Sequence, residues 1–439
     1  MPNENNFLEK ALLVQVETTK VRRILNFENS FEEFKDLARS AGANVLGEIK
    51  GKQELASPRY FIQKGKLEEI KQEVHKNKIG LVIFNHALSP SQERNIERYL
   101  KARVLDRTGL ILDIFARRAF SHIGKLQVEL AQLSHLSTRL VRGWSHLERQ
   151  KGGIGLRGPG ETQLETDRRL LKARINTIQK RLNKVSNQRK LSRNLRLKRD
   201  ILRISIVGYT NAGKSTLFNY LTGMNTLSAD KLFATLDPIH RKIQLKNKKN
   251  AVISDTVGFI RKLPHHLIES FKSTLSEVSE SNLLIHVIDL SDNNFPNYIK
   301  EVDSVLKSIG ANKIPKILVF NKIDHNYNPE NFSHLQQDSS CYVSAKTGYG
   351  IDFLRQTISN RLFEKYHIVK IELPSLDNKI RSQIYEQCIN VSETFTKSGQ
   401  CKMEFLANSH FTKYLKKKGL INRNTQKKSK NAQEIYKTG

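Results

Sequence analysis

The sequence predicts a multidomain α/β protein with a long helical hairpin and a basic tail. Three observations lead to this fold class. Strand-like apolar segments alternate with amphipathic segments before residue 112. Apolar residues then recur at heptad spacing around a glycine-rich segment, and a phosphate-binding loop follows a strand after residue 201. The predicted parts are an N-terminal α/β domain (1–112), a long antiparallel helical hairpin (113–200), a nucleotide-binding α/β domain (201–364), a small C-terminal α/β appendage (365–411) and a disordered basic tail (412–439).

The composition points to a polyanionic partner. The 439 residues include 74 Lys and Arg against 43 Asp and Glu, a formal net charge of +31, which favours RNA, DNA or an anionic membrane as partner. The three cysteines form no CxxC pair, so neither a disulfide framework nor a zinc site is expected. The N-terminal residues do not have the charged and apolar regions of a secretory signal, and the sequence has no run of roughly 18 apolar residues. We therefore expect a cytoplasmic protein without a membrane span, with peripheral association with a membrane left open.

The N-terminal domain is predicted from short elements. ALLVQVE (11–17) and GLVIFN (80–85) are typical of strands because they are short and rich in Val, Ile and Leu. SFEEFKDLARSAG (30–42) is predicted to be a helix that begins at a Ser cap and ends at glycine, and a second helix is predicted over 64–77. No catalytic constellation is found in this domain.

Heptad spacing predicts the hairpin. Leu126, Leu130, Leu133 and Leu140 precede the glycine-rich segment. After it, the apolar positions recur every seven residues, with two more between them: Leu164, Leu171, Ile175, Ile178, Leu182 and Val185. Such positions form the seam of two paired helices. The glycine-rich loop 151–161 is therefore predicted to join an antiparallel pair, with Thr162 and Glu165 at capping-box spacing marking the start of the second helix.

The second helix of this hairpin is strongly basic. Residues 168–203 contain fourteen Lys or Arg and one acid, Asp200. Either the charges form a solvated face or they bind an anion. We favour the anionic partner because uncompensated charge of this density repels itself.

GYTNAGKST (208–216) follows an apolar strand and precedes an apolar helix, the context that the phosphate-binding loop requires. Lys214 is expected to reach the β- and γ-phosphates and Ser215 to bind Mg²⁺. Backbone N–H groups and the helix N-terminus would hold the phosphates. The expected contacts from this loop are Gly208, Tyr209, Thr210, Asn211, Ala212, Gly213, Lys214, Ser215 and Thr216.

NKID (321–324) indicates guanine rather than adenine. Asp324 can accept two hydrogen bonds from the N1–H and N2 amino groups of guanine, and adenine offers no such donor pair. Asn321 and Lys322 are expected to brace the base and the loop. The segment SAK (Ser344, Ala345 and Lys346) would place backbone N–H groups near guanine O6. GTP and GDP are therefore the expected ligands of a Ras-like P-loop GTPase domain.

Two further segments carry the expected switch residues. Thr235 in FATLD should close over Mg²⁺ when the γ-phosphate is present, Asp255 should contact the ion through water, and Gly258 should donate its N–H to the γ-phosphate. The metal set is thus Ser215, Thr235 and Asp255, and the catalytic set is Lys214, Thr235 and Gly258. Phe259 stands where many GTPases carry a water-orienting glutamine, so hydrolysis by the protein alone should be slow.

Two side chains near these motifs have more than one interpretation. Asn211 occurs where some GTPases hold a potassium ion, and a K⁺ site there is kept open. His286 is interpreted as a core histidine because it lies in the middle of a strand-like segment.

The segment 124–171, together with GYTNAGKSTLFN, LFATLDP and DTVGFIRKLP, resembles the HflX-type GTPases of the Obg-HflX group. The resemblance implies a ribosome-associated GTPase that binds the large (50S) subunit and, in the GTP state, splits stalled or stressed 70S ribosomes. It implies that GTP hydrolysis releases the protein, that it acts as a monomer, and that the hairpin reaches the peptidyl-transferase region of 23S rRNA. The candidate rRNA contacts are Gly152, Gly153, Arg157, Gly158, Gly160, Arg168, Arg169, Lys172 and Arg174.

Two other functions were weighed. One is an RNA-remodelling, nucleotide-dependent chaperone, although the sequence shows a single P-loop and no helicase motif. The other is a GTPase partner in tRNA modification. That class often carries a C-terminal catalytic cysteine, and neither Cys388 nor Cys401 lies in such a motif.

Overall fold

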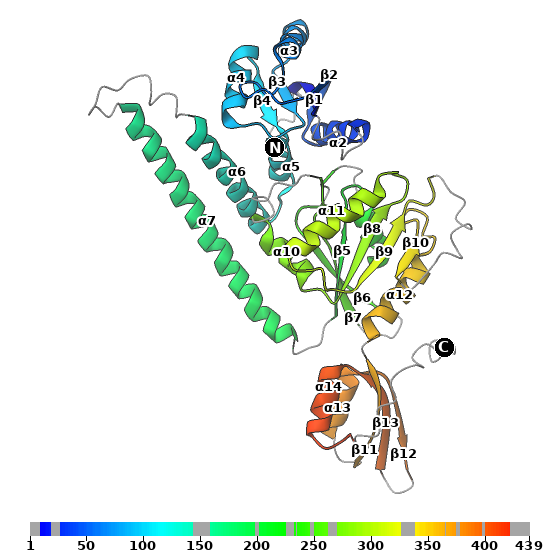
Figure 1. Cartoon of the computed structure of the whole chain (residues 1–439). Coiled ribbons are helices and arrows are strands. Elements are labelled where there is room, and N and C mark those ends of the chain that lie inside the picture. The colour runs from blue at the N-terminus through cyan, green and yellow to red at the C-terminus, as the bar shows by residue number, and fades with distance from the viewer. Residues whose placement is uncertain are drawn as a thin grey trace, which may run out of the picture.

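The computed structural model describes most of the chain in three folded domains and a helix pair (Figure 1). The described residues are 9–18, 27–143, 159–197, 202–224, 232–233, 235–245, 250–261, 270–325, 339–364, 366–374, 378–396 and 400–421. Most of the predicted glycine-rich loop, including Gly152, Gly153, Arg157 and Gly158, and the tail after residue 421 lie outside these residues. No helix among the described segments is long and apolar enough to cross a lipid bilayer.

The N-terminal domain is a parallel sheet covered on both faces. Alternate residues of its central strand β1 pack on opposite sides: Ala11 and Leu13 lie in one apolar cluster, and Leu12 and Val14 in another. The sheet order is β2-β1-β3-β4. Its strands are β1 (Glu9–Thr18), β2 (Ala43–Gln53), β3 (Leu81–Phe84) and β4 (Arg103–Asp106), and its helices are α2 (Phe27–Ser40), α3 (Lys64–Asn77), α4 (Pro90–Leu100) and α5 (Arg107–Arg118).

Both predicted strands and the helix over 64–77 are confirmed in this domain. The predicted start of the other helix at Ser30 is wrong, because α2 begins at Phe27 and its first turn carries Glu28. Ser30 lies inside the helix instead of capping it, and its carbonyl accepts a hydrogen bond from Asn85 at 3.3 Å. The predicted boundary at residue 112 falls inside α5, which runs to Arg118.

The helix pair consists of α6 (His122–Gly143) and α7 (Pro159–Leu197), which lie side by side in opposite directions (Figure 1). Several of the predicted apolar positions meet there: Leu126 and Leu130 of α6 pack with Ile178 and Leu182 of α7, and Leu133 and Ile175 are partly buried against them. The side chains of Leu140 and Leu164 lie outside the described residues. The predicted start of α7 at Thr162 is wrong, because the helix begins at Pro159. Proline is favoured in the first turn, where its missing N–H is not needed. Gly160 is therefore a helical residue and not part of a loop.

The nucleotide-binding domain has a six-stranded sheet in the order β10-β9-β8-β5-β7-β6, in which only β6 runs antiparallel to its neighbour. Because the other strands are parallel, the loops that follow them meet at one edge of the sheet. The strands are β5 (Leu202–Gly208), β6 (Ile239–Gln244), β7 (Asn250–Asp255), β8 (Leu283–Asp289), β9 (Lys316–Asn321) and β10 (Ser340–Tyr342). The helices are α8 (Lys214–Thr222), α10 (Lys272–Ser279), α11 (Phe295–Ser308) and α12 (Ile351–Phe363). His286 is a core residue, 1% exposed, as predicted.

The C-terminal domain is an antiparallel sheet, in the order β11-β13-β12, with two helices. Its elements are β11 (His367–Pro374), α13 (Asn378–Gln387), β12 (Ile389–Phe395), β13 (Gln400–Ala407) and α14 (Ser409–Lys417). The predicted strands 370–374 and 402–406 are confirmed. The prediction of disorder from residue 412 is wrong as far as residue 421, because α14 buries Thr412 and Leu415, and Ile421 packs in the same cluster.

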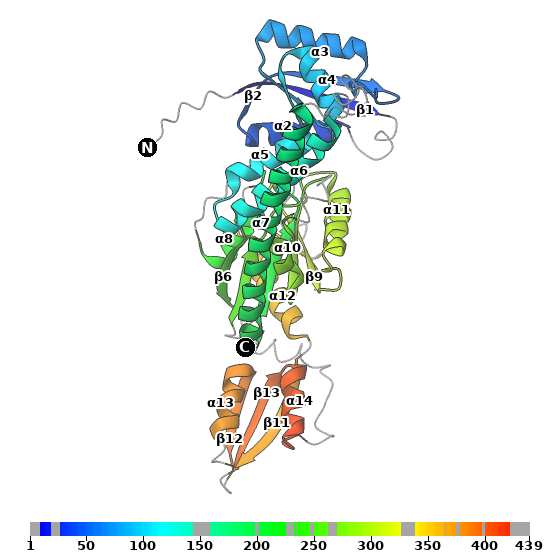
Figure 2. The same ribbon diagram turned by 90° about the vertical axis from the view of Figure 1, so that its left-hand side faces the viewer.

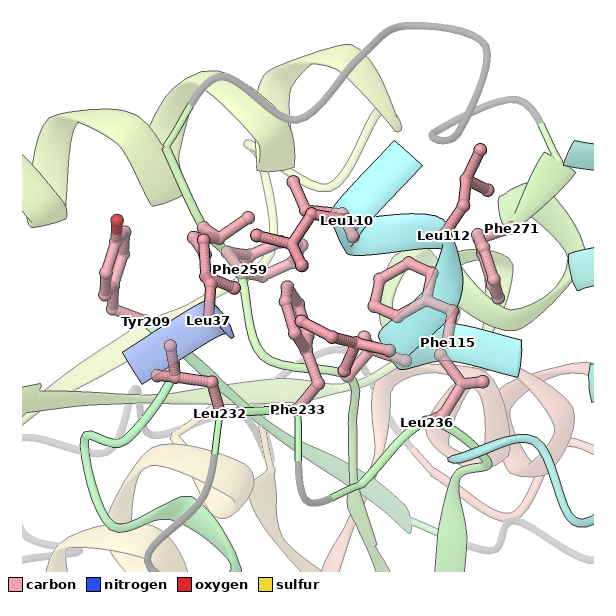
Figure 3. Close-up of a cluster of buried hydrophobic side chains, with 14 of the residues drawn as sticks. Leu37, Leu110, Leu112, Phe115, Tyr209, Leu232, Phe233, Leu236, Phe259 and Phe271 are labelled. Carbon is pink, nitrogen blue, oxygen red and sulfur yellow. The ribbon is translucent and has the colours of Figure 1, made fainter. Parts of the chain in front are cut away.

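One apolar cluster joins the N-terminal domain to the nucleotide-binding domain (Figure 3). Phe115 of α5 lies 4.7 Å from Phe233 and 5.1 Å from Phe271 between ring centroids, in edge-to-face arrangements. Leu37 and Phe259 belong to the same cluster. The two domains therefore share a core next to the loops at the end of the nucleotide-binding sheet. The helix pair passes along the nucleotide-binding domain, as Figure 2 shows from a second direction.

Candidate nucleotide-binding site

The phosphate-binding loop connects β5 to α8 in a conformation that depends on glycine. Gly213 has a φ of 87°, a value that side chains disfavour, and a Cβ built on it would collide with the amide of Asn321. Asn321 donates from Nδ2 to the carbonyl of Ala212 at 2.9 Å, and its Oδ1 accepts from the Ala345 N–H at 2.9 Å. One side chain thus ties the P-loop to the SAK segment.

A cavity of about 250 Å³ lies over this loop. Predicted residues from all of the nucleotide motifs line it: Thr210, Asn211, Gly213, Lys214, Ser215, Thr216, Thr235, Gly258, Asn321, Lys322, Asp324, Ala345 and Lys346. Five predicted residues do not line it: Gly208, Tyr209, Ala212, Asp255 and Ser344. Three residues that were not predicted do line it: Phe233, Thr256 and His325. Each of these lies inside or directly beside a predicted motif, so its position in the sequence could have identified it.

Lys214 is the buried cation of the cavity. Its Nζ donates to the carbonyl of Tyr209 at 2.6 Å. Burial lowers the pKa of Lys214 to about 8; Lys322 acts in the same direction and Asp255 opposes it. A phosphate placed beside Nζ would favour the charged ammonium, so this lysine is suited to bind an anion.

Oxygen atoms of Ser215, Thr235 and Asp255 form a candidate metal site. Ser215 Oγ lies 2.6 Å from Asp255 Oδ2 and 2.9 Å from Thr235 Oγ1, and Thr235 Oγ1 donates to Asp255 Oδ2 at 2.9 Å. Asp255 Oδ1 is buried and forms no hydrogen bond with any described residue. Burial raises the pKa of Asp255 despite the hydrogen bonds from Ser215 and Thr235. Hydroxyl and carboxylate oxygens in this arrangement fit a hard divalent cation such as Mg²⁺.

The base-recognition residues Lys322 and Asp324 line the same cavity. Lys322 Nζ forms an ion pair with Asp289 at 2.7 Å, which fixes the start of the NKID segment. Burial acts to raise the pKa of Asp324, but the hydrogen bonds from Ser344 and from the Asp324 N–H, together with the charges of His325 and Lys346, outweigh it, so the pKa lies below its usual value. Asp324 is thus an ionised acceptor, as recognition of the guanine N1–H and N2 amino groups requires. Ser344 contributes through Asp324 and not as a wall of the cavity.

Phe259 turns away from the cavity. It is 3% exposed and packs in the cluster shared with the N-terminal domain (Figure 3). Its backbone is bound to the P-loop: the Phe259 N–H donates to Gly208 at 3.1 Å, and its carbonyl accepts from the Thr210 N–H at 2.8 Å. The segment after Gly258 therefore couples the P-loop to the domain interface and offers no polar side chain at position 259 to orient water.

A buried polar cluster behind the P-loop was not predicted. Tyr209 donates from its hydroxyl to Glu33 of α2 at 2.7 Å, and Arg261 Nε donates to the same carboxylate at 3.0 Å. Arg107 pairs with the other oxygen of Glu33. Burial acts to raise the pKa of Glu33, but the charges of Arg107 and Arg261 and the Tyr209 hydroxyl outweigh it, so the pKa is lowered. Tyr209 therefore contacts the N-terminal domain with its side chain, and only its backbone faces Lys214.

The predicted basic residues of α7 are exposed on the helix pair. Arg168, Arg169 and Lys172 have exposed side chains. Arg174 is also exposed, but it forms an ion pair with Glu129 of α6 at 2.6 Å. Arg174 thus connects the two helices as well as adding to the charge of α7.

Comparisons with known proteins match most of the chain. Family models described as "GTP-binding GTPase N-terminal", "GTP-binding GTPase Middle Region" and "50S ribosome-binding GTPase" match residues 28–116, 118–196 and 203–322. The chain is 50% identical over 381 residues to the GTPase HflX of Escherichia coli (strain K12), covering 86% of this chain and 88% of that protein. It is 43% identical over 391 residues to the GTPase HflX of Caldanaerobacter subterraneus subsp. tengcongensis, covering 89% of each. A crystal structure of SsGBP with GDP aligns with 80% of this chain and 98% of that chain at 28% identity and a TM-score of 0.46. With such identity to HflX proteins over most of both chains, the chain belongs to the HflX family of GTPases.

Proposed function

We propose that this GTPase binds the 50S ribosomal subunit in its GTP state and splits stalled or stressed 70S ribosomes into subunits, and that GTP hydrolysis then releases it. The observation that carries the proposal is the exposed basic surface of α7, formed by Arg168, Arg169 and Lys172, on a helix pair attached to a guanine-nucleotide site. A surface of this charge suits rRNA phosphates. The description of the matching family model, a 50S ribosome-binding GTPase, agrees with this partner.

Within the site, the geometry supports the following proposed roles. Lys214 binds the β- and γ-phosphates, and Gly258 donates its N–H to the γ-phosphate. Ser215 and Thr235 would hold Mg²⁺, with Asp255 contacting the ion through water, and the ion would neutralise the charge that develops on the phosphate oxygens. Asp324 accepts from guanine, while Asn321 and Lys322 hold the two loops together.

The same proposal makes hydrolysis slow until the ribosome acts. Because Phe259 is buried in the domain interface, position 259 supplies no group that orients water. Single-turnover hydrolysis should therefore be faster with 50S or 70S particles than without them. Fast turnover by the free protein, unchanged by ribosomes, would contradict it.

A potassium ion beside Asn211 is a further part of the proposal. Asn211 lines the cavity and has a positive φ of 61°. Replacing K⁺ by Na⁺ in the assay should lower the rate of GTP hydrolysis. An unchanged rate would contradict a role for K⁺ in hydrolysis.

The contact with 23S rRNA is proposed to involve the glycine-rich segment near the peptidyl-transferase region, together with the basic residues of α7. Glycines there would let the backbone pass where a Cβ would clash with bases or sugars. The proposal also places the protein in the cytoplasm, acting as a monomer.

Co-sedimentation tests the function directly. The protein is centrifuged with 70S ribosomes, 50S subunits or tRNA, each with a non-hydrolysable GTP analogue or GDP, and light scattering reports splitting of 70S particles. Binding to 50S with the GTP analogue, accompanied by a fall in scattering, supports the proposal. Binding to tRNA alone would instead support a role in tRNA modification, against which Cys388 and Cys401 are both buried.

A further inference from the structure

Asp237 links the switch segment of the nucleotide site to the start of the helix pair. Its Oδ2 accepts hydrogen bonds from the backbone N–H groups of Phe120 at 3.0 Å and Ser121 at 2.7 Å, and its Oδ1 accepts from the Ser121 hydroxyl. These donors lie 116 and 117 residues away in sequence and immediately precede α6. One carboxylate of the nucleotide-binding domain therefore holds the base of α6.

The start of α6 is built to receive this carboxylate. Ser121 caps the helix, because its hydroxyl oxygen accepts from the Gly124 N–H at 2.9 Å. A Cβ built on Gly124 would collide with the carboxylate of Asp237, so the contact requires a glycine at this position. A negative charge beside a helix N-terminus is also stabilised by the helix dipole.

Asp237 is also close in sequence to the candidate metal site. Thr235, whose hydroxyl bonds Ser215 and Asp255, is only two residues earlier. Leu236 between them is 3% exposed and fixed in the core shared by the two domains. Two residues span at most about 7 Å, so a displacement of the α6 base by several ångströms must move Thr235 or break the bonds of Asp237.

The far part of α6 is attached to the N-terminal domain. Arg139 forms ion pairs with Glu93 of α4 and, at 3.1 Å, with Asp106. Thus α6 connects the N-terminal domain to the segment that carries Thr235, and Asp237 supplies the polar attachment beside the shared apolar cluster, to which Val128 and Ala131 of α6 also belong.

We propose that Asp237 is a positioning residue for GTP hydrolysis: by fastening the switch segment to the base of α6, it holds Thr235 in place for Mg²⁺ and the γ-phosphate. Movement of the helix pair changes the placement of Thr235 through the same bonds. Asp237 acts through the proposed role of Thr235, so the inference rests on that part of the proposed function. It does not rest on ribosome binding, because the free protein carries every group involved.

The experiment measures single-turnover hydrolysis by the free full-length protein as a function of Mg²⁺ concentration, together with the affinities for GDP and for a GTP analogue. Asp237→Ala should lower the rate and the GTP-analogue affinity by about tenfold, the order expected for loss of charge-assisted hydrogen bonds, and should leave GDP affinity unchanged. It should also raise the Mg²⁺ concentration needed for the half-maximal rate. Asp237→Asn, which keeps an acceptor oxygen, should fall between Asp237→Ala and wild type.

Two variants approach the same contact from outside the switch segment. Gly124→Ala leaves Asp237 in the chain but crowds its carboxylate, so it should reproduce the pattern of Asp237→Ala. Asp352→Asn is the matched control: Asp352 is an exposed acid in the first turn of another helix, α12, and its replacement should leave all four measurements unchanged.

The outcomes separate the two levels of the proposal. If Thr235→Ala changes neither Mg²⁺ dependence nor GTP-analogue affinity, the proposed role of Thr235 fails, and with it the inference. If Thr235→Ala has these effects while Asp237→Ala behaves like Asp352→Asn, the inference alone is overturned. An equal loss of GDP and GTP-analogue affinity in Asp237→Ala, with a lower melting temperature, would also overturn it, because that pattern indicates general destabilisation.

Discussion

At the scale of single residues, we expect Asp324 to decide which base the site accepts. It is ionised and lines the cavity, so it can pair with two donors of guanine. Asp324→Asn should weaken GTP binding by roughly 2–4 kcal/mol, because one guanine donor then faces an amide donor. The same variant should bind xanthine nucleotide better than wild type does, since xanthine offers an acceptor there. Competition binding with ATP, GTP and XTP measures this, and equal affinity of the wild type for ATP and GTP would refute the role of Asp324.

Glu33 is the second residue with a sharp expected effect. It compensates Arg107 and Arg261 in a buried cluster, so Glu33→Gln leaves two buried guanidinium groups without their carboxylate. Removal of one partner from a buried pair typically costs about 3–5 kcal/mol. Glu32→Gln is the control, because Glu32 is a neighbouring exposed acid whose partner Lys35 also pairs with Glu48. Denaturant unfolding compares the free energies of unfolding, and equal losses in the two variants would contradict the expectation.

The pH dependence of this cluster has a defined sign. The folded pKa of Glu33 lies below the value of about 4.5 expected in the unfolded chain. Its contribution is therefore present above pH 4.5 and disappears as the pH falls through the folded pKa. Wild type should lose more stability than Glu33→Gln in this acidic range.

The residues of the nucleotide site could be predicted from sequence because phosphate and guanine chemistry fixes residue types at fixed spacings. Lys214, Asp324 and Thr235 were found in this way. Glu33 could not be found, because its partners Arg107, Tyr209 and Arg261 lie 74, 176 and 228 residues away, and no local pattern records such contacts. The same holds for the contact between Asp237 and Ser121.

At the scale of elements, the exposed face of α7 should determine salt-dependent affinity. Charge reversal of Arg168, Arg169 and Lys172 should weaken 50S binding, and each lost phosphate contact should reduce the log–log salt slope by roughly 0.7–0.9. The control reverses three exposed lysines on and beside α11, Lys300, Lys307 and Lys313, with the same change in net charge. Filter binding at several salt concentrations compares the slopes. If both sets reduce the slope equally, net charge and not α7 carries the affinity.

Elements with strong local patterns were predicted, and those defined by their neighbours were not. The heptad positions placed the α6/α7 contact, because helix periodicity is a property of the segment itself. Strand β2 was missed, since Gly47, Gly51 and its charged residues resemble a loop in isolation; pairing with β1 makes it a strand. Helix α14 was concealed by the lysines around it, although Asn408 caps it at 2.7 Å and Leu415 is buried.

At the scale of the whole molecule, the N-terminal and nucleotide-binding domains are joined through a shared apolar core. Phe233, Phe259 and Leu236 come from segments that line or adjoin the nucleotide cavity, and they pack on α2 and α5 of the other domain (Figure 3). The C-terminal domain has its own separate apolar cluster. A destabilising substitution in the first cluster should therefore weaken nucleotide binding, whereas one in the cluster of the C-terminal domain should not.

Phe115→Ala and Phe405→Ala form a matched pair for this expectation, because each phenylalanine is 1% exposed and each lies in one of the two clusters. Either substitution should destabilise its own core by about 3–5 kcal/mol through lost burial and the cavity left behind. Phe115→Ala also removes the edge-to-face contacts with Phe233 and Phe271, so the segment before Thr235 loses its support. We expect Phe115→Ala to weaken binding of a GTP analogue and Phe405→Ala to leave it unchanged, as measured by calorimetric titration at a temperature where both variants remain folded. Equal nucleotide affinities in the two variants would mean that the interface supports folding only and that the nucleotide site does not depend on the N-terminal domain.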